Sequence, residues 1–138
     1  MIKSDIIHPE LLCALAKCGH KTQILVADSN YAFVTNAPKD ATIIYLNLAP
    51  GTLCSPIILE KILACINVEK ATLMAYPPDF TNTIEPEYRQ LLPAGCPIEF
   101  LSREDFYIQV KSDQTLLVIA SGEVRRFANL LLTVAPVI

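Results

Sequence analysis

Glycine is scarce in this chain, which has only four among its 138 residues. Loops that bind nucleotide phosphates depend on several closely spaced glycines, so a nucleotide-dependent enzyme is disfavoured. No cluster of histidine, cysteine, aspartate and glutamate has the spacing of metal ligands. These absences argue against an enzyme that depends on a nucleotide or a metal.

Charge is also low, at 18% of residues with a net charge of −3. Without a basic patch, nucleic acid is not an expected partner. No run of about 18 apolar residues exists to span a membrane, and no apolar stretch follows Lys3 as in a signal peptide. The five cysteines include no Cys-x-x-Cys pair, which favours reduced thiols. These absences together predict a cytoplasmic protein.

Hydrophobic residues are abundant, at 52% of the chain. This proportion and the length predict one domain over residues 1–138 with a substantial core. A small domain with few charges and much apolar surface often covers part of it with copies of itself. We therefore expect a homo-oligomer.

Helical and strand patterns alternate along the chain, and the strands are apolar throughout. This alternation predicts an α/β fold with a mostly parallel sheet and helices on both faces. Ser55 is expected to be the N-cap of the second helix. Helices are predicted for 9–18, 55–66 and 86–92, with a fourth opening at 102–105, and strands for 23–27, 42–46, 71–76, 98–101, 115–120 and 129–135.

Ligands of such folds bind at the carboxyl ends of the strands. Asp28, Arg103 and the segment 121–129 fall near such ends. Asp28 is either a cap for the loop that follows or a ligand for hydroxyl groups. Arg103 is either a multi-donor group for sugar hydroxyls or an exposed arginine paired with a neighbour.

Two histidines are candidates for proton transfer, since this side chain titrates near neutral pH. His20 follows Gly19 at a helix-to-strand turn and is either an acid–base group or a loop residue in solvent. His8 precedes Pro9 and is interpreted as a helix-start residue. Arg125 and Arg126 are interpreted as a solvated pair, with a subunit contact as the alternative.

Several short motifs in order resemble one family over nearly the whole chain, that of the L-fucose mutarotases and D-ribose pyranases. The resemblance is closest to the fucose branch. The matching residues are Pro9-Glu10-Leu11-Leu12, Gly19-His20 and Asp28 near the start, Arg103 with Phe106 and Tyr107, and Ser121-Gly122-Glu123 followed by Phe127-Ala128-Asn129 near the end.

The resemblance implies a three-layer α/β sandwich that interconverts anomers of a monosaccharide such as L-fucose by cofactor-free acid–base chemistry. It implies that His20 is the catalytic proton donor. It implies that the sugar is bound by Asp28, Arg103, Phe127 and Asn129. It also implies a homo-oligomeric ring, often a decamer, in which a neighbouring subunit completes each site.

The chain departs from the family pattern in three places. Phe127 stands where the family usually has tyrosine, Thr22 replaces an aspartate, and Ser29-Asn30-Tyr31 replaces the usual loop after Asp28. Two alternatives therefore accompany the mutarotase interpretation. One is D-ribose pyranase activity, and the other is a non-catalytic monosaccharide-binding protein on the same fold.

Overall fold

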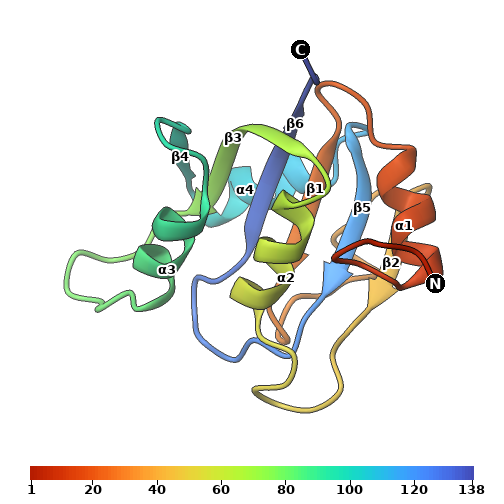
Figure 1. Ribbon diagram of the computed structural model, residues 1–138. Coiled ribbons are helices and arrows are strands. Elements are labelled where there is room, and N and C mark those ends of the chain that lie inside the picture. Colours follow the sequence, from red (N-terminus) through yellow and green to blue (C-terminus); the bar gives the residue numbers. More distant parts are fainter.

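The computed structural model describes all residues 1–138 and contains four helices and one six-stranded sheet (Figure 1). The helices are α1 (Pro9–Ala16), α2 (Ser55–Leu63), α3 (Ile84–Leu91) and α4 (Arg103–Val110). The strands are β1 (Gln23–Ala27), β2 (Thr42–Tyr45), β3 (Asn67–Met74), β4 (Ile98–Leu101), β5 (Thr115–Ala120) and β6 (Leu130–Ala135). None of the four helices has the length and apolar character needed to cross a bilayer.

The sheet has the strand order β2-β5-β1-β6-β3-β4. The pairs β2–β5, β1–β5 and β3–β4 are parallel, while β6 runs antiparallel to both β1 and β3. The prediction of a mostly parallel α/β sheet is thus confirmed. Five strands end at one edge of the sheet, and the loop that enters β6 lies at the same edge (Figure 1).

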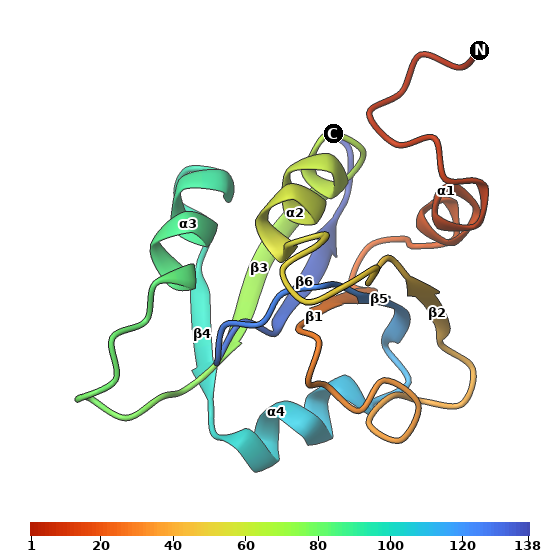
Figure 2. The ribbon, with the colours of Figure 1, turned by 90° about the horizontal axis from the view of Figure 1, so that it is seen from below.

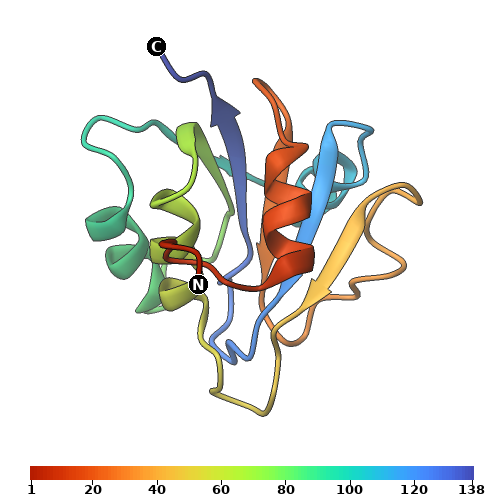
Figure 3. The ribbon, with the colours of Figure 1, turned by 45° about the vertical axis from the view of Figure 1, so that its right-hand side comes forward.

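Helices cover both faces of the sheet, as predicted. Ile24 and Val26 of β1 belong to the larger core, which lies beneath α1, α2 and α3, whereas Leu25 and Ala27 face the smaller core beneath α4. Figure 2 shows α4 and the three other helices on opposite sides of the sheet, and Figure 3 shows α1 in front of the sheet, running along the strands. All residues of β1 are buried, because both of its faces are covered.

Side chains cap the starts of two helices, both near the positions expected from the sequence. The Nδ1 atom of His8 accepts a hydrogen bond from the backbone N–H of Leu11, 3.1 Å away, at the start of α1. The Oγ of Ser102 accepts one from the backbone N–H of Asp105 at 3.2 Å. Each cap satisfies a backbone donor that has no partner inside the helix.

The predicted N-cap of α2 is wrong. Cys54 is the N-cap, and Ser55 is the first helical residue, with its hydroxyl buried against other polar groups. A serine directly before a proline is a typical N-cap pattern. Here the Ser55 side chain instead contacts polar groups that are distant in the sequence.

Some element bounds also differ from the prediction. The strand expected at 71–76 starts four residues earlier, at Asn67, since Asn67, Val68 and Lys70 of this mostly polar stretch pair with the end of β6. The helix expected at 86–92 starts at Ile84, where the Oδ1 of Asn82 accepts hydrogen bonds from two backbone N–H groups.

Candidate functional site

A cavity of about 250 Å³ opens at the carboxyl edge of the sheet. It is smaller than the roughly 300–1,000 Å³ of pockets for drug-sized ligands, so it suits a small molecule. The lining comes from the ends of β1 and β3, the start of α4 and the loop before β6. It comprises Asp28, Asn30, Tyr31, Met74, Arg103, Tyr107, Arg126, Phe127 and Asn129.

Four of the five site residues predicted from the sequence therefore meet in this one cavity: Asp28, Arg103, Phe127 and Asn129. The carboxyl edge is where parallel α/β sheets bind ligands, because the loops there surround the ends of the strands. No group of three or more His, Cys, Asp or Glu side chains is arranged to hold a metal ion. The polar groups that line the cavity are the Asp28 carboxylate, the amides of Asn30 and Asn129, the hydroxyls of Tyr31 and Tyr107, and the guanidinium groups of Arg103 and Arg126.

Asp28 and Asn129 form a reciprocal pair at the floor of the cavity. The backbone N–H of Asp28 donates to Asn129 Oδ1 at 2.8 Å, and Asn129 Nδ2 donates to Asp28 Oδ2 at 3.1 Å. The N–H of Asn30 donates to Asp28 Oδ1 at 3.0 Å. Burial raises the pKa of Asp28 despite these donors. Asp28 therefore caps the loop and lines the cavity, so the two interpretations of this residue are compatible.

Aromatic rings form one wall of the site. Phe127 has a positive φ of 59° and packs on Phe80 and Tyr76 with ring centroids 4.8 and 5.8 Å apart. Tyr31 and Tyr107 lie edge to face at 5.8 Å, and the Tyr31 hydroxyl donates to the Asn36 carbonyl at 2.7 Å. Such rings offer apolar faces to the C–H surface of a small polar ligand.

The solvated pair expected from the sequence is only half confirmed, because Arg126 is exposed whereas Arg125 is half-buried. The Arg126 guanidinium carbon lies 5.3 Å from the centroid of the Phe80 ring and 5.2 Å from that of Phe127, and the side chain lines the cavity. Arg125 instead turns toward the buried carboxylate of Glu123. Consecutive residues of an irregular segment can point in different directions, and the sequence contains no signal that distinguishes them.

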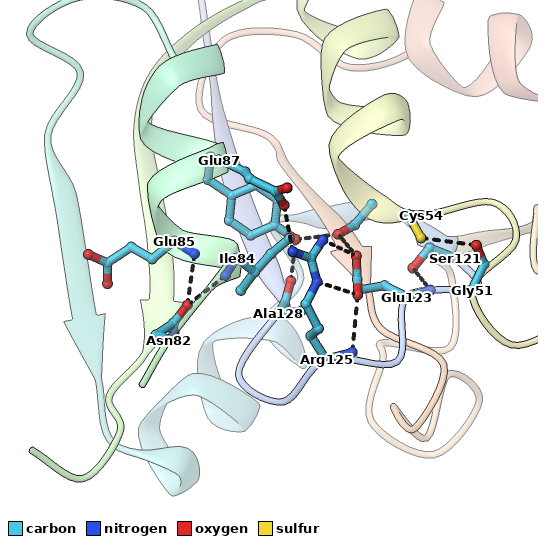
Figure 4. A network of polar contacts seen from close by, with 12 residues as sticks. Gly51, Cys54, Asn82, Ile84, Glu85, Glu87, Ser121, Glu123, Arg125 and Ala128 are labelled. Atoms are coloured by element: carbon cyan, nitrogen blue, oxygen red, sulfur yellow. Dashed lines mark hydrogen bonds and ion pairs between the residues drawn. The ribbon is translucent and has the colours of Figure 1, made fainter. Parts of the chain in front are cut away.

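Glu123 is the centre of a buried polar network behind the cavity (Figure 4). Its Oε1 accepts from the N–H and Nε of Arg125 at 3.1 and 2.9 Å, and its Oε2 accepts from Arg125 Nη2 at 3.0 Å and from Ser55 at 3.2 Å. Arg125 also pairs with Glu87 at 2.7 Å. Burial opposes ionisation of Glu123, but the Arg125 contacts prevail and hold its pKa below the ordinary value.

Tyr88 connects this network to the site. Its hydroxyl donates to the carbonyl oxygen of Ala128 at 2.6 Å and lies 2.6 Å from the Ser55 hydroxyl. Ala128 precedes Asn129, so the network holds the segment 121–129 against α2 and α3. Sequence reasoning did not identify Ser55, Tyr88 or Glu123 as parts of the site, since their contacts span distant segments.

His20 lies apart from the cavity, at the other end of β1. Its ring is 46% exposed, and its Nε2 lies 3.0 Å from Glu69 Oε2, while Glu69 Oε1 pairs with Lys21. Figure 1 shows the loop between α1 and β1 near the C-terminus, at the edge opposite the loop that enters β6. The five residues of β1 alone separate the two regions by about 16 Å. A single chain therefore does not bring His20 to the other predicted site residues.

Comparisons with known proteins agree with the fold. The family model described as the RbsD / FucU transport protein family matches residues 1–137. The D-ribose pyranase of Geobacillus kaustophilus (strain HTA426) is 28% identical over 132 residues, covering 96% of this chain and 92% of that protein. The human fucose mutarotase is 27% identical over 138 residues, covering 92% and 87%.

Solved structures give the same result. FucU from Bifidobacterium longum superposes with a TM-score of 0.84 at 31% identity, covering 96% of each chain. The fucose mutarotase of Streptococcus pneumoniae in complex with L-fucose has a TM-score of 0.81 at 27% identity, covering 96% of this chain and 95% of that one. With the same fold over nearly all of its length and a family model that matches almost every residue, the chain belongs to the RbsD / FucU transport protein family.

Proposed function

We propose that this protein is a sugar mutarotase, an isomerase that interconverts anomers of a monosaccharide by acid–base ring opening. The main observation behind the proposal is that Asp28, Arg103, Phe127 and Asn129 line one small cavity at the carboxyl edge of the sheet. Relatives named fucose mutarotase and D-ribose pyranase, and a relative solved with bound L-fucose, support it.

The cavity groups have separate roles in the proposed reaction. Ring opening removes a proton from the anomeric hydroxyl and delivers one to the ring oxygen, and ring closure on the other face reverses this. Asp28 and Asn129 orient sugar hydroxyls, and Arg103 stabilises negative charge that develops on oxygen. Phe127 packs on the C–H face of the sugar. No redox step occurs, so acid–base groups and hydrogen bonds suffice.

The proton donor in this proposal is His20, supplied by a neighbouring copy of the chain. His20 is exposed and lies at the edge of the sheet opposite the cavity, so it can reach a cavity only on another subunit. The proposal therefore includes a homo-oligomer, a ring and possibly a decamer, in which each cavity is completed across an interface.

The test is proton NMR saturation transfer between the anomers of L-fucose, repeated with D-ribose. The protein should accelerate anomer exchange, and His20→Ala should abolish that acceleration while its circular dichroism and oligomeric state stay unchanged. General acid catalysis typically contributes about 10² to 10⁴ in rate, so the loss should be large.

The matched control is His8→Asn, which alters the only other histidine but keeps a good N-cap residue at the start of α1. This variant should exchange anomers as the parent does. If His20→Ala is as active as the parent, His20 is not the acid.

The choice of sugar separates the alternatives. Acceleration of pyranose–furanose exchange of D-ribose, with no effect on L-fucose anomers, would assign the protein to the D-ribose pyranase branch. Sugar binding by calorimetry with no acceleration of any exchange would identify a non-catalytic sugar-binding protein. Phe127, which lacks the hydroxyl of the usual tyrosine, is the residue that motivates this second alternative.

A further inference from the structure

The four arginines of the chain fall into two groups. Arg89 pairs with Glu85, and Arg125 pairs with Glu123 and Glu87. Arg103 and Arg126 pair with no carboxylate, and their side chains donate no hydrogen bond within the chain. These two unpaired guanidinium groups line the same cavity.

Arg126 is held in place by its aromatic neighbours. Its guanidinium lies over both the Phe80 and the Phe127 rings at just over 5 Å, within the range of a cation–π contact. Such stacking orients the planar group and leaves its N–H donors free. Arg126 is exposed, but these rings orient its guanidinium and no carboxylate pairs with it, so the group is suited to bidentate binding of an anionic group.

The charge of the cavity is therefore unbalanced. Within one chain, Asp28 is the only carboxylate that lines the cavity, and the N–H of Asn30 and the amide of Asn129 already donate to that group. A neighbouring copy that supplies His20 would also bring Glu69, which is already paired with His20 and Lys21. Two cationic side chains face this one acidic group, although the whole chain has a net charge of −3. Arg103 and Arg126 are both exposed, so with a neutral sugar only solvent and salt ions would balance their charge.

We infer that the preferred ligand of this cavity is a monosaccharide bearing an anionic group, a carboxylate or a phosphate, which Arg126 binds together with Arg103. The asparagines and Asp28 then bind its hydroxyls. The inference rests on the proposed function, since it names the class of sugar that the same site takes. Arg126, which directly precedes Phe127, is the residue that determines the preference for an anionic sugar.

The test compares sugars that differ only at carbon 6. Titration calorimetry would measure the affinity of the intact oligomer for D-galactose, D-galacturonate and D-galactose 6-phosphate, and for the corresponding D-glucose series. We expect the acid or the phosphate to bind about tenfold tighter than its neutral parent, with a preference that weakens as salt is added. The uronate and phosphate arms distinguish the two anionic groups.

Variants then locate the preference. Arg126→Gln should reduce the ratio of anionic to neutral affinity by about tenfold, and Arg126→Lys should retain part of it. Lys17→Gln, which removes one positive charge from an exposed position at the end of α1, is the control and should leave the ratio unchanged. Neutral parents that bind as tightly as the anionic sugars, or an unchanged ratio in Arg126→Gln, would overturn the inference.

Saturation transfer on the same samples separates this inference from the proposed function. Tight binding of an anionic sugar with no faster exchange would support the inference and reject the mutarotase. Faster exchange of neutral sugars without any preference for anionic ones would do the reverse. No binding of any sugar would reject both.

Discussion

Two buried carboxylates at the same edge of the sheet have pKa values shifted in opposite directions. Burial raises the pKa of Asp28, whose donors include the neutral groups of Asn30 and Asn129. Burial acts on Glu123 as well, but there the cationic Arg125 outweighs it and the pKa falls. The pKa is therefore lower for the carboxylate with a cationic donor than for the one with neutral donors.

Glu123→Gln should lower the free energy of unfolding by about 2 kcal/mol at neutral pH. Removing one partner of a buried pair typically costs roughly 3–5 kcal/mol, but Arg125 stays one-third exposed and keeps Glu87, which reduces the loss. Because the folded-state pKa of Glu123 is lowered, its stabilisation is present above the ordinary glutamate pKa and disappears as pH falls through the folded value.

Urea unfolding of the parent and the variant at several pH values measures this. The difference in unfolding free energy should be constant above about pH 5 and should shrink below about pH 4. Glu60→Gln, at an exposed position on α2, is the control and should differ little from the parent. A difference that grows on acidification would contradict the assigned direction of the pKa shift.

At the level of elements, the site depends on two irregular segments that pack backbone to backbone. The N–H of Gly51 donates to the Gly122 carbonyl, and the N–H of Gly122 donates to the Leu53 carbonyl, both at 2.7 Å. A Cβ at position 122 would lie 2.1 Å from the Thr52 carbonyl oxygen. Glycine is required here by close approach, and the segment 121–129 starts at this contact.

Gly122→Ala should therefore destabilise the protein by about 3 kcal/mol or more, because the backbone around Thr52 must move to make room. It should also weaken sugar binding, since the segment carries Phe127 and Asn129. Thermal unfolding and calorimetry test both effects. Gly19→Ala is the matched control, because a Cβ at Gly19 meets no atom within 4 Å. Equal stability of the two variants would show that the contact is easily displaced.

The elements themselves were largely predictable from local patterns. Short apolar runs bounded by Pro, Gly or polar residues correctly located β1, β4 and β5, and the helix starts expected at residue 9 and at 102–105 agree with α1 and α4. The errors occurred where distant partners overrode the local signal. The Ser55 hydroxyl bonds with Tyr88 and Glu123 instead of capping α2. The mostly polar start of β3 is a strand because it pairs with β6.

For the whole molecule, the position of His20 leads to a test of subunit cooperation. His20→Ala and Asp28→Asn should each be inactive alone. When the two are co-expressed and form mixed oligomers, about a quarter of the sites should combine an intact His20 from one copy with an intact cavity from another. Saturation transfer should then show partial recovery of activity.

The control for this experiment mixes the two purified variants under conditions where subunits do not exchange, which should leave the sample inactive. Mass measurement should give a multiple of 15.2 kDa for parent and variants. A monomeric mass, or no recovery in mixed oligomers, would mean that His20 does not act across an interface.

The sequence alone contained the order of helices and strands, the α/β class and the family, because these follow from local periodicity, turn residues and short motifs. It did not contain the grouping of residues in space. Asp28 and Asn129 are 101 residues apart and hydrogen-bonded, because β6 lies antiparallel beside β1. His20 is close to Asp28 in sequence, yet an extended strand carries the two to opposite edges of the sheet. The cationic cavity likewise exists only because α4 and the loop before β6 meet at one edge, which no local pattern encodes.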